Sequence, residues 1–192
     1  MQTLVLGLAA FLIPHSLRIF AEPWRGRMLQ RLGEGPWKIL YSLVSLGGLA
    51  LLVWGYANAR HAGALLWAPP AGMRHATVLL MLFSFVLLVA AYVPGNRIRA
   101  GVGHPMLLGI ALWAVAHLLA NGSAPDVLLF AAFLAWSLVA YFVARTRDRA
   151  AGRTIATAGL ARDAITLIAG LAGWAFFAHV GHLWLIGVRP MG

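Results

Sequence analysis

The chain has 192 residues, of which 61% are hydrophobic and only 10% are charged, whereas soluble domains carry about 25% charged residues. This balance predicts a membrane protein, and the length suits one compact bundle. The net charge of +10 does not require a nucleic-acid partner, because short basic cytoplasmic loops give a membrane protein such a charge. The lack of cysteine excludes disulfides, iron–sulfur clusters, thiolate-ligated haem and a cysteine nucleophile.

The chain begins with an apolar stretch, MQTLVLGLAAFLIPHSLRIF, that no positive charge precedes. A cleaved signal peptide normally has a basic region there, so we expect a retained first helix. Five more apolar segments follow, and a hydrocarbon core of about 30 Å needs about 20 apolar residues in each. The six predicted spans are Thr3–Phe20, Lys38–Tyr56, His75–Val93, Pro105–Ala120, Pro125–Val143 and Ala164–Gly187. The predicted fold is therefore an all-α, polytopic membrane helix bundle that forms a single domain over residues 1–192 and has the lipid bilayer as its solvent.

The charges between the spans predict how the bundle is oriented. Twelve Arg or Lys residues fall on one side of the membrane, around residues 18–38, 97–99 and 145–162, and three fall on the other, namely Arg60, Arg74 and Arg189. Positive residues concentrate in cytoplasmic loops. We therefore expect a multi-pass protein of the bacterial inner membrane with both termini in the periplasm.

Small residues recur within the spans at spacings that allow helices to approach closely. Gly47 and Gly48 lie in the second predicted span, and Ala169 and Gly173 lie in the sixth. We expect these positions to contact neighbouring helices.

Two histidines lie inside predicted spans, where an ionisable side chain indicates a function. His15 and His117 each lie about 12 residues into their spans, which run in opposite directions, so both are predicted near mid-membrane. Two neutral imidazoles that face each other across an iron would explain both. The alternative is that each ring donates a hydrogen bond to a neighbouring helix carbonyl.

A third histidine, His104, lies after the glycine-rich AGVG and before Pro105, a pattern typical of a helix start. Free N–H groups there favour an anion, and Arg97 and Arg99 are close in sequence. This corner suits a propionate, a lipid phosphate or a substrate head group; the alternative is an ordinary helix start with a solvated loop. His104 and His117 are about 20 Å apart along a helix and cannot ligate the same metal.

The other polar residues offer less chemistry. His179 and His182 share a helix face at i and i+3, which suits a metal or an interfacial pair. His61 and His75 are predicted at the outer surface. The five carboxylates fall in loops or at span ends, so neither a Ser–His–Asp triad nor a buried proton relay is predicted.

Two sequence blocks resemble the NnrU family: HSLRIF…W…RLGEGPWKILYSLVSLGGLALLVWGY over His15–Tyr56, and HPMLLGIALWAVAHLLANG over His104–Gly122. The resemblance covers most of the chain. It implies a bacterial inner-membrane protein linked to denitrification, in nitrite and nitric oxide reduction. The same domain is similar to 15-cis-zeta-carotene isomerase, a haem b enzyme.

The resemblance also implies a ligand set. The isomerase holds its haem between two histidines that match His15 and His117, and a further histidine proposed to exchange as ligand falls near His61. Members usually carry Arg before the His-Pro motif, where this chain has Gly103; Arg97 or Arg99 would substitute. We therefore expect a b-type haem on His15 and His117, with Asn121 as a supporting donor and Arg18 and Arg97 at the propionates.

Two classes of function stay open. One is an accessory protein of nitrite or nitric oxide respiration, whose partner is a respiratory reductase. The other is an enzyme, a haem-dependent cis–trans isomerase of a carotenoid-like alkene, with a hydrophobic small molecule as its partner. A membrane methyltransferase is a weaker third reading, because some of those enzymes also place a His-Pro motif before a helix.

Overall fold

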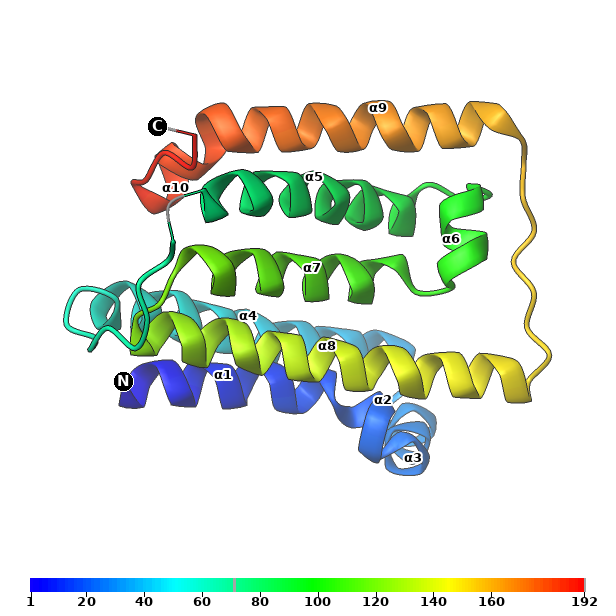
Figure 1. Cartoon of the computed structure of the whole chain (residues 1–192). Coiled ribbons are helices and arrows are strands. Elements are labelled where there is room, and N and C mark those ends of the chain that lie inside the picture. Colours follow the sequence, from blue (N-terminus) through cyan, green and yellow to red (C-terminus); the bar gives the residue numbers. More distant parts are fainter. Residues whose placement is uncertain (71, 192) are drawn as a thin grey trace. The chain divides into compact units, whose positions relative to one another are not determined.

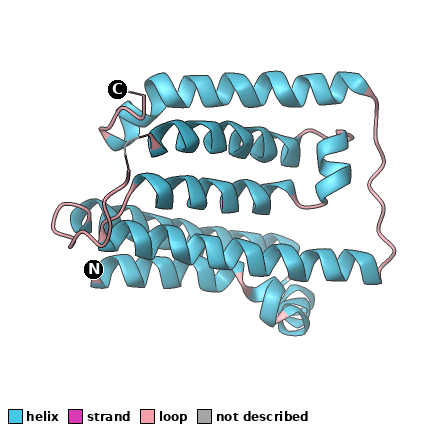
Figure 2. Ribbon diagram, in the orientation of Figure 1, coloured by secondary structure: helices cyan, strands magenta, loops and turns pink. Residues whose placement is uncertain are grey.

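A computed structural model describes residues 1–70 and 72–191. The chain is 79% helical, and no strand occurs in the described ranges. Figure 2 shows helices joined by loops throughout. The all-α prediction is confirmed.

The helices, which Figure 1 labels where there is room, follow one another along the chain. They are α1 (Gln2–His15), α2 (Leu17–Phe20), α3 (Glu22–Leu32), α4 (Glu34–Ala59), α5 (Met73–Tyr92), α6 (Arg97–Val102), α7 (Pro105–Ala120), α8 (Ala124–Ala150), α9 (Leu160–Phe176), the π-helix η1 (Phe177–Gly181) and α10 (His182–Ile186). Their contacts form two compact units. The first unit comprises Met1–Trp67 and Ser123–Ala132, and the second comprises Ala68–Gly122 and Phe133–Gly192. That the whole chain forms a single domain stays a prediction.

An apolar helix occurs at each of the six predicted spans. Within the described residues, four helical stretches are long and apolar enough to cross a bilayer: α4, α5, α8, and the stretch Leu160–Ile186. The other two, α1 and α7, have 14 and 16 residues. At about 1.5 Å per residue they are about 21 and 24 Å long, short of a hydrocarbon core of about 30 Å. The count of six spans is therefore not confirmed.

The first unit is built on the close packing of α1 against α4. A Cβ added at Gly7 would lie 2.4 Å from the backbone nitrogen of Leu52, and one added at Gly48 would lie 2.7 Å from that of Phe11. Gly7 of α1 meets Leu52 of α4, whereas the later residue Phe11 meets the earlier residue Gly48, so the two helices are antiparallel. Backbone approach of this kind needs glycine at the contact. Gly48 is thus confirmed as a packing position, whereas Gly47 has no atom within 4 Å of an added Cβ.

The first predicted span is interrupted near its end. Helix α1 ends at His15, and α2 begins at Leu17. Pro14 has no N–H with which to continue the helical hydrogen bonds, and the Ser16 hydroxyl donates to the Leu12 carbonyl at 2.7 Å. Such side-chain bonds compete with a regular helix and bend it. His15 is therefore the last residue of α1 and does not lie within one continuous helix over Thr3–Phe20; its depth in the membrane stays a prediction.

The second unit contains α5, α7 and α9 side by side (Figure 1). The buried Ser84 hydroxyl on α5 donates to the Gly109 carbonyl on α7 at 2.8 Å. Gly170 on α9 approaches the backbone of Val86 on α5, where an added Cβ would lie 2.8 Å from its Cα. The tight contact of the sixth segment therefore lies at Gly170, and Gly173 makes only ordinary contact with Phe85.

Two stretches that the sequence suggested were loops are helical. Helix α3 forms within the basic region before the second span, and α6 forms within the segment that includes AGVG. The side chain of Asn96 caps α6 by accepting from the Arg99 N–H at 2.7 Å. Asn96 is fully buried and donates to the Ala90 carbonyl, which explains why a helix of six residues is stable there.

Many large apolar side chains remain exposed along these helices. They include Ile39, Leu43 and Trp54 on α4, and Ile168 and Phe176 on α9. Monomeric soluble proteins rarely expose so large an apolar surface to water, whereas a bilayer solvates it. The chain is a multi-pass membrane protein in contact with lipid.

Candidate functional site

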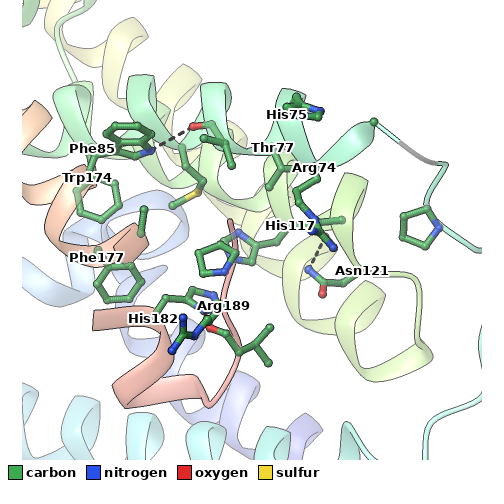
Figure 3. Close-up of a pocket in the computed structure, with 18 of the residues that line it drawn as sticks. Arg74, His75, Thr77, Phe85, His117, Asn121, Trp174, Phe177, His182 and Arg189 are labelled. Carbon is green, nitrogen blue, oxygen red and sulfur yellow. Dashed lines mark hydrogen bonds between the residues drawn. The ribbon is translucent and has the colours of Figure 1, made fainter. Parts of the chain in front are cut away.

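The second unit contains a cavity of about 550 Å³ at one end of its helices. Figure 3 shows residues of α5, α7, α9, the π-helix and the C-terminal segment converging on it. Its half-buried walls include Phe85, Trp174 and Phe177. Three histidines also line it: His75, His117 and His182. An apolar cavity with a few convergent polar groups is the usual form of a ligand site.

His117 enters this cavity from the last turn of α7. Its Nδ1 lies 2.8 Å from the carbonyl oxygen of Trp113, and its ring packs against the Trp113 ring at 5.2 Å. A carbonyl oxygen can only accept, so Nδ1 is the donor. In the neutral ring the lone pair is then on Nε2, the arrangement that metal-binding histidines use.

Asn121 also lines the cavity, one turn beyond His117. Its amide donates to the backbone carbonyl of His117 at 2.9 Å. This hydrogen bond of the expected supporting donor joins the backbone at the end of α7, and it stabilises the helix end that carries His117.

His182 belongs to the same cavity, whereas His179 does not. The expected pairing of the two on one helix face assumed regular α-helical geometry, and the π-helix Phe177–Gly181 interrupts that geometry. His179 is exposed, whereas His182 is half-buried and lines the cavity. The Nδ1 of His182 lies 2.7 Å from the Val188 carbonyl oxygen and therefore donates to it.

Two arginines contribute to the mouth of the cavity. Arg74 precedes His75 at the start of α5, and Arg189 follows α10; both are exposed. Sequence reasoning did not select them. A signal was nevertheless present, because Arg74 and Arg189 are two of only three basic residues on the predicted outer side of the membrane. Cations that depart from the positive-inside pattern suggest a function.

His15 lies in the first unit, beside a different cavity of about 670 Å³. Its Nδ1 lies 2.6 Å from the Phe11 carbonyl oxygen, and its ring stacks on that of Phe11 at 4.3 Å. Arg18, Arg25 and Lys38 also line this cavity. Within it, Lys38 pairs with Glu34 at 2.6 Å. His15 thus has the same hydrogen bond as His117, in a cavity that has more charged side chains in its lining.

The corner at the start of α7 contains an ion pair and a histidine–carboxylate hydrogen bond. The Arg97 side chain binds Asp163, and the Nε2 of His104 lies 2.8 Å from an Asp148 carboxylate oxygen. Arg99 donates to the Ala91 carbonyl at 3.2 Å. The anions that meet Arg97 and His104 are therefore carboxylates of this chain, and the ligand expected at this corner stays a prediction. His104 and His117 lie about 20 Å apart along α7, so the corner and the His117 cavity are separate places.

The comparisons with known proteins give one match. The family model for NnrU proteins matches residues 3–190, which is nearly the whole chain. The chain belongs to the NnrU family. No curated protein and no solved structure matches it.

The donors around the His117 cavity of this NnrU protein suit a haem. A porphyrin supplies four nitrogens to its iron, so one or two imidazoles complete the site, and a protein cluster of three ligands is not needed. Among the described residues no cluster of three or more His, Cys, Asp or Glu side chains could hold a bare metal ion. The aromatic walls match the apolar face of a macrocycle, and the arginines at the mouth match its acidic groups.

Proposed function

We propose that this NnrU protein is an integral-membrane haem b protein in which His117 binds the iron. The observation that carries the proposal is the hydrogen bond from His117 Nδ1 to the Trp113 carbonyl. It orients the ring and leaves the metal-binding lone pair on Nε2, in a half-buried side chain that lines an apolar cavity. The family resemblance supports the same residue.

Each group around the cavity has a defined role in this proposal. His117 holds the cofactor, and the Trp113 carbonyl fixes the orientation of its imidazole. Phe85, Trp174 and Phe177 exclude water from the apolar face of the haem. Burial of this kind changes the reduction potential of the iron. Haem b would supply one-electron chemistry and an affinity for small gaseous ligands.

The experiment is an absorption spectrum of the full chain purified from cells that have an ample haem supply. We expect a Soret band in the wild type and its loss in His117→Ala. His179→Ala is the matched control, since His179 is exposed and does not line the cavity. His75→Ala is less suitable because His75 lines it. A wild-type protein without Soret absorption would refute the proposal.

For the biological role, we propose support of nitrite or nitric oxide reduction, on the strength of the resemblance. The corresponding test adds nitric oxide to the reduced protein. A shift of the Soret band at micromolar nitric oxide supports this role, and an unchanged spectrum contradicts it.

A second candidate is cis–trans isomerisation of a carotenoid-like alkene. The aromatic walls favour it, since Phe85, Trp174 and Phe177 offer an apolar surface to a polyene. Isomerisation transfers no atoms between molecules, so the test needs no second substrate. The protein is incubated with a cis-polyene, and the isomers are separated by chromatography. Conversion in the wild type but not in His117→Ala would favour this candidate over the respiratory one.

The proposed location is the bacterial inner membrane, with both termini in the periplasm. The excess of basic residues around 18–38, 97–99 and 145–162 supports this orientation. Reporter fusions after Gly192 should report the periplasm, and fusions within residues 145–162 should report the cytoplasm. A cytoplasmic C-terminus would show that the sixth segment does not cross.

A further inference from the structure

The cavity of the first unit lies where α2 and α3 meet the end of α1 and the beginning of α4. Figure 1 shows α3 nearly end-on beside the α1–α4 pair, so it runs across these two helices. The ring of Trp24 on α3 packs edge-on against the buried Trp37 on α4, with ring centroids 6.1 Å apart. Because α4 is long and apolar enough to cross a bilayer, its first turns lie at the level of the lipid head groups. The cavity and the transverse helix α3 therefore lie at the membrane surface, where such aromatic residues are frequent.

The cation Arg25 lies on the apolar face of α3. At 3.6 residues per turn it shares this face with Trp24 and Leu29, whereas Arg27 lies on nearly the opposite side of the helix. Arg25 is half-buried and lines the cavity, while Arg27 is exposed and does not line it. The Arg25 side chain donates to the Glu22 carboxylate at 3.1 Å, which orients it. Because a guanidinium has five N–H donors in a fixed fork, it can bind a phosphate in addition to this carboxylate.

The charges around the cavity suit an anion. Arg18, Arg25 and Lys38 line it, and Glu34 is the only acidic side chain among its described lining residues. Glu34 pairs with Lys38 at 2.6 Å. Glu22, which accepts from Arg25, also lies 3.7 Å from the Nε of Arg18. Three cations thus share two carboxylates, and a phosphate would supply the missing negative charge.

The surface around the cavity favours a lipid over a free phosphate. Phe20 on α2 is 77% exposed, and Ile39 and Leu43 on α4 are 64% and 63% exposed. These side chains are adjacent in sequence to residues that line the cavity, so acyl chains attached to a bound phosphate would cover them, whereas inorganic phosphate would gain nothing from them. Gln30 and Ser42 add neutral polar groups to the lining, which suit the hydroxyl groups of a lipid head group.

We infer that this cavity binds the head group of an anionic phospholipid, with the phosphate on Arg25 and Lys38 and the acyl chains along the exposed apolar surface. Basic pockets on the cytoplasmic side of membrane helices bind acidic lipid head groups. The cations within residues 18–38 predict this side for the cavity. His15 has no part in the proposed phosphate contact, so the haem ligands that the family resemblance implies are unaffected. The inference does not depend on the proposed haem function.

The test is the affinity of the purified full chain, in a neutral detergent, for phosphatidylglycerol, measured by native mass spectrometry over a titration. Phosphatidylcholine and inorganic phosphate are the comparison ligands. The wild type should bind phosphatidylglycerol about tenfold more tightly than phosphatidylcholine, and an excess of inorganic phosphate should not displace it.

The variants separate the cavity from the charge of the surface. Arg25→Gln should weaken phosphatidylglycerol binding about tenfold, and the exposed Lys38→Gln about threefold. Arg25→Lys keeps the charge without the fork and should recover part of the affinity. Arg27→Gln is the matched control, and at raised ionic strength, which screens exposed charges, its affinity should stay within about twofold of the wild type. Circular dichroism checks that each variant keeps its helices.

Each contrary outcome is specific. Equal affinities for phosphatidylglycerol and phosphatidylcholine overturn the recognition of an anionic head group. Equal losses in Arg25→Gln and Arg27→Gln assign the binding to the surface charge and overturn the cavity. Displacement by inorganic phosphate shows a site for a free anion and overturns the lipid. If Arg25→Gln does not fold, an unchanged affinity in Lys38→Gln overturns the inference. None of these outcomes changes the Soret test of the proposed function.

Discussion

The two units offer the same histidine hydrogen bond in two different surroundings. His15 and His117 both donate from Nδ1 to the carbonyl four residues earlier. Around His15 the cavity is lined by Trp37 and Tyr41, by three Arg or Lys side chains and by Glu34, which pairs with Lys38. Around His117 it is lined by aromatic side chains, two further histidines and two arginines. The bond to the i−4 carbonyl therefore sets the tautomer in both, and the surroundings decide which ring suits a buried cofactor.

The two units also differ in how their helices are held together. In the first unit, glycines let the backbones of α1 and α4 touch. In the second unit, a glycine contact joins α9 to α5 at Gly170, whereas α5 and α7 are joined by hydroxyl groups of α5 that donate to carbonyls of α7. Tight backbone contact leaves no space for an added atom, whereas a single hydroxyl bond in a membrane contributes little. The α1–α4 contact should therefore be more sensitive to one added methyl group than the α5–α7 contact is to the loss of one hydroxyl group.

The largest effect is expected at Gly48. A methyl group there would lie 2.7 Å from the Phe11 backbone nitrogen, so the helices must separate. We expect Gly48→Ala to cost about 2–3 kcal/mol, in the range for overpacking, measured by denaturation in mild detergent. The matched control is Gly47→Ala, where nothing lies within 4 Å of the added Cβ. Equal losses in the two variants would refute the packing described for α1 and α4.

A smaller effect is expected at Tyr56, also in the first unit. Its hydroxyl donates to the buried Asp126 carboxylate at 2.6 Å. We expect Tyr56→Phe to lose about 1.5–2 kcal/mol of stability, since bonds to charged groups exceed neutral ones. Tyr92→Phe is the control because Tyr92 is 76% exposed. No difference between the two phenylalanine variants would show that the Tyr56–Asp126 bond contributes nothing.

Substitution of the arginines that line each cavity tests which of the two cavities holds the haem. Arg74→Gln and Arg189→Gln should each weaken haem retention about three- to tenfold, a modest loss because both side chains are exposed. Arg25→Gln, in the cavity of the first unit, should leave retention unchanged. The transfer of haem to apomyoglobin measures haem retention in all three variants. A larger loss in Arg25→Gln would move the acidic groups of the haem to the first unit.

The smallest effect is expected at Ser84 in the second unit. Its hydroxyl bond to the Gly109 carbonyl is fully buried, and interhelical bonds in membranes average about 0.6 kcal/mol. Ser84→Ala should therefore change stability by about that amount. A loss as large as that of Gly48→Ala would remove the difference between the α1–α4 and α5–α7 contacts.

The sequence was sufficient to predict the six apolar segments, because composition along 20 residues reports burial in lipid directly. It also singled out His117 and predicted the helix start at Pro105, which follows Gly103 and His104. His15 was expected within one continuous helix, because the bonding of Ser16 that accompanies the helix break cannot be recognised from hydropathy. Gly48 was predicted as a contact, but Gly173 was chosen where Gly170 packs more tightly, since helix register is fixed only by the partner.

The composition of the His117 cavity could not be read from the sequence. Its residues come from segments about 115 positions apart, between Arg74 and Arg189. The π-helix that separates His179 from His182 has no simple sequence pattern, so spacing indicated that they share a face. The carboxylates that meet Arg97 and His104 likewise lie far along the chain, at Asp163 and Asp148.

The central claim is that haem occupies the cavity of the second unit. Because the chain has no cysteine, a single introduced cysteine carries a spin label at a unique position. Pro69→Cys labels the second-unit cavity and Gln30→Cys labels the first-unit cavity; both residues line their cavities and are exposed. The relaxation enhancement of each label by the haem iron measures its proximity. We expect the stronger enhancement at position 69, and a stronger enhancement at position 30 would contradict the account.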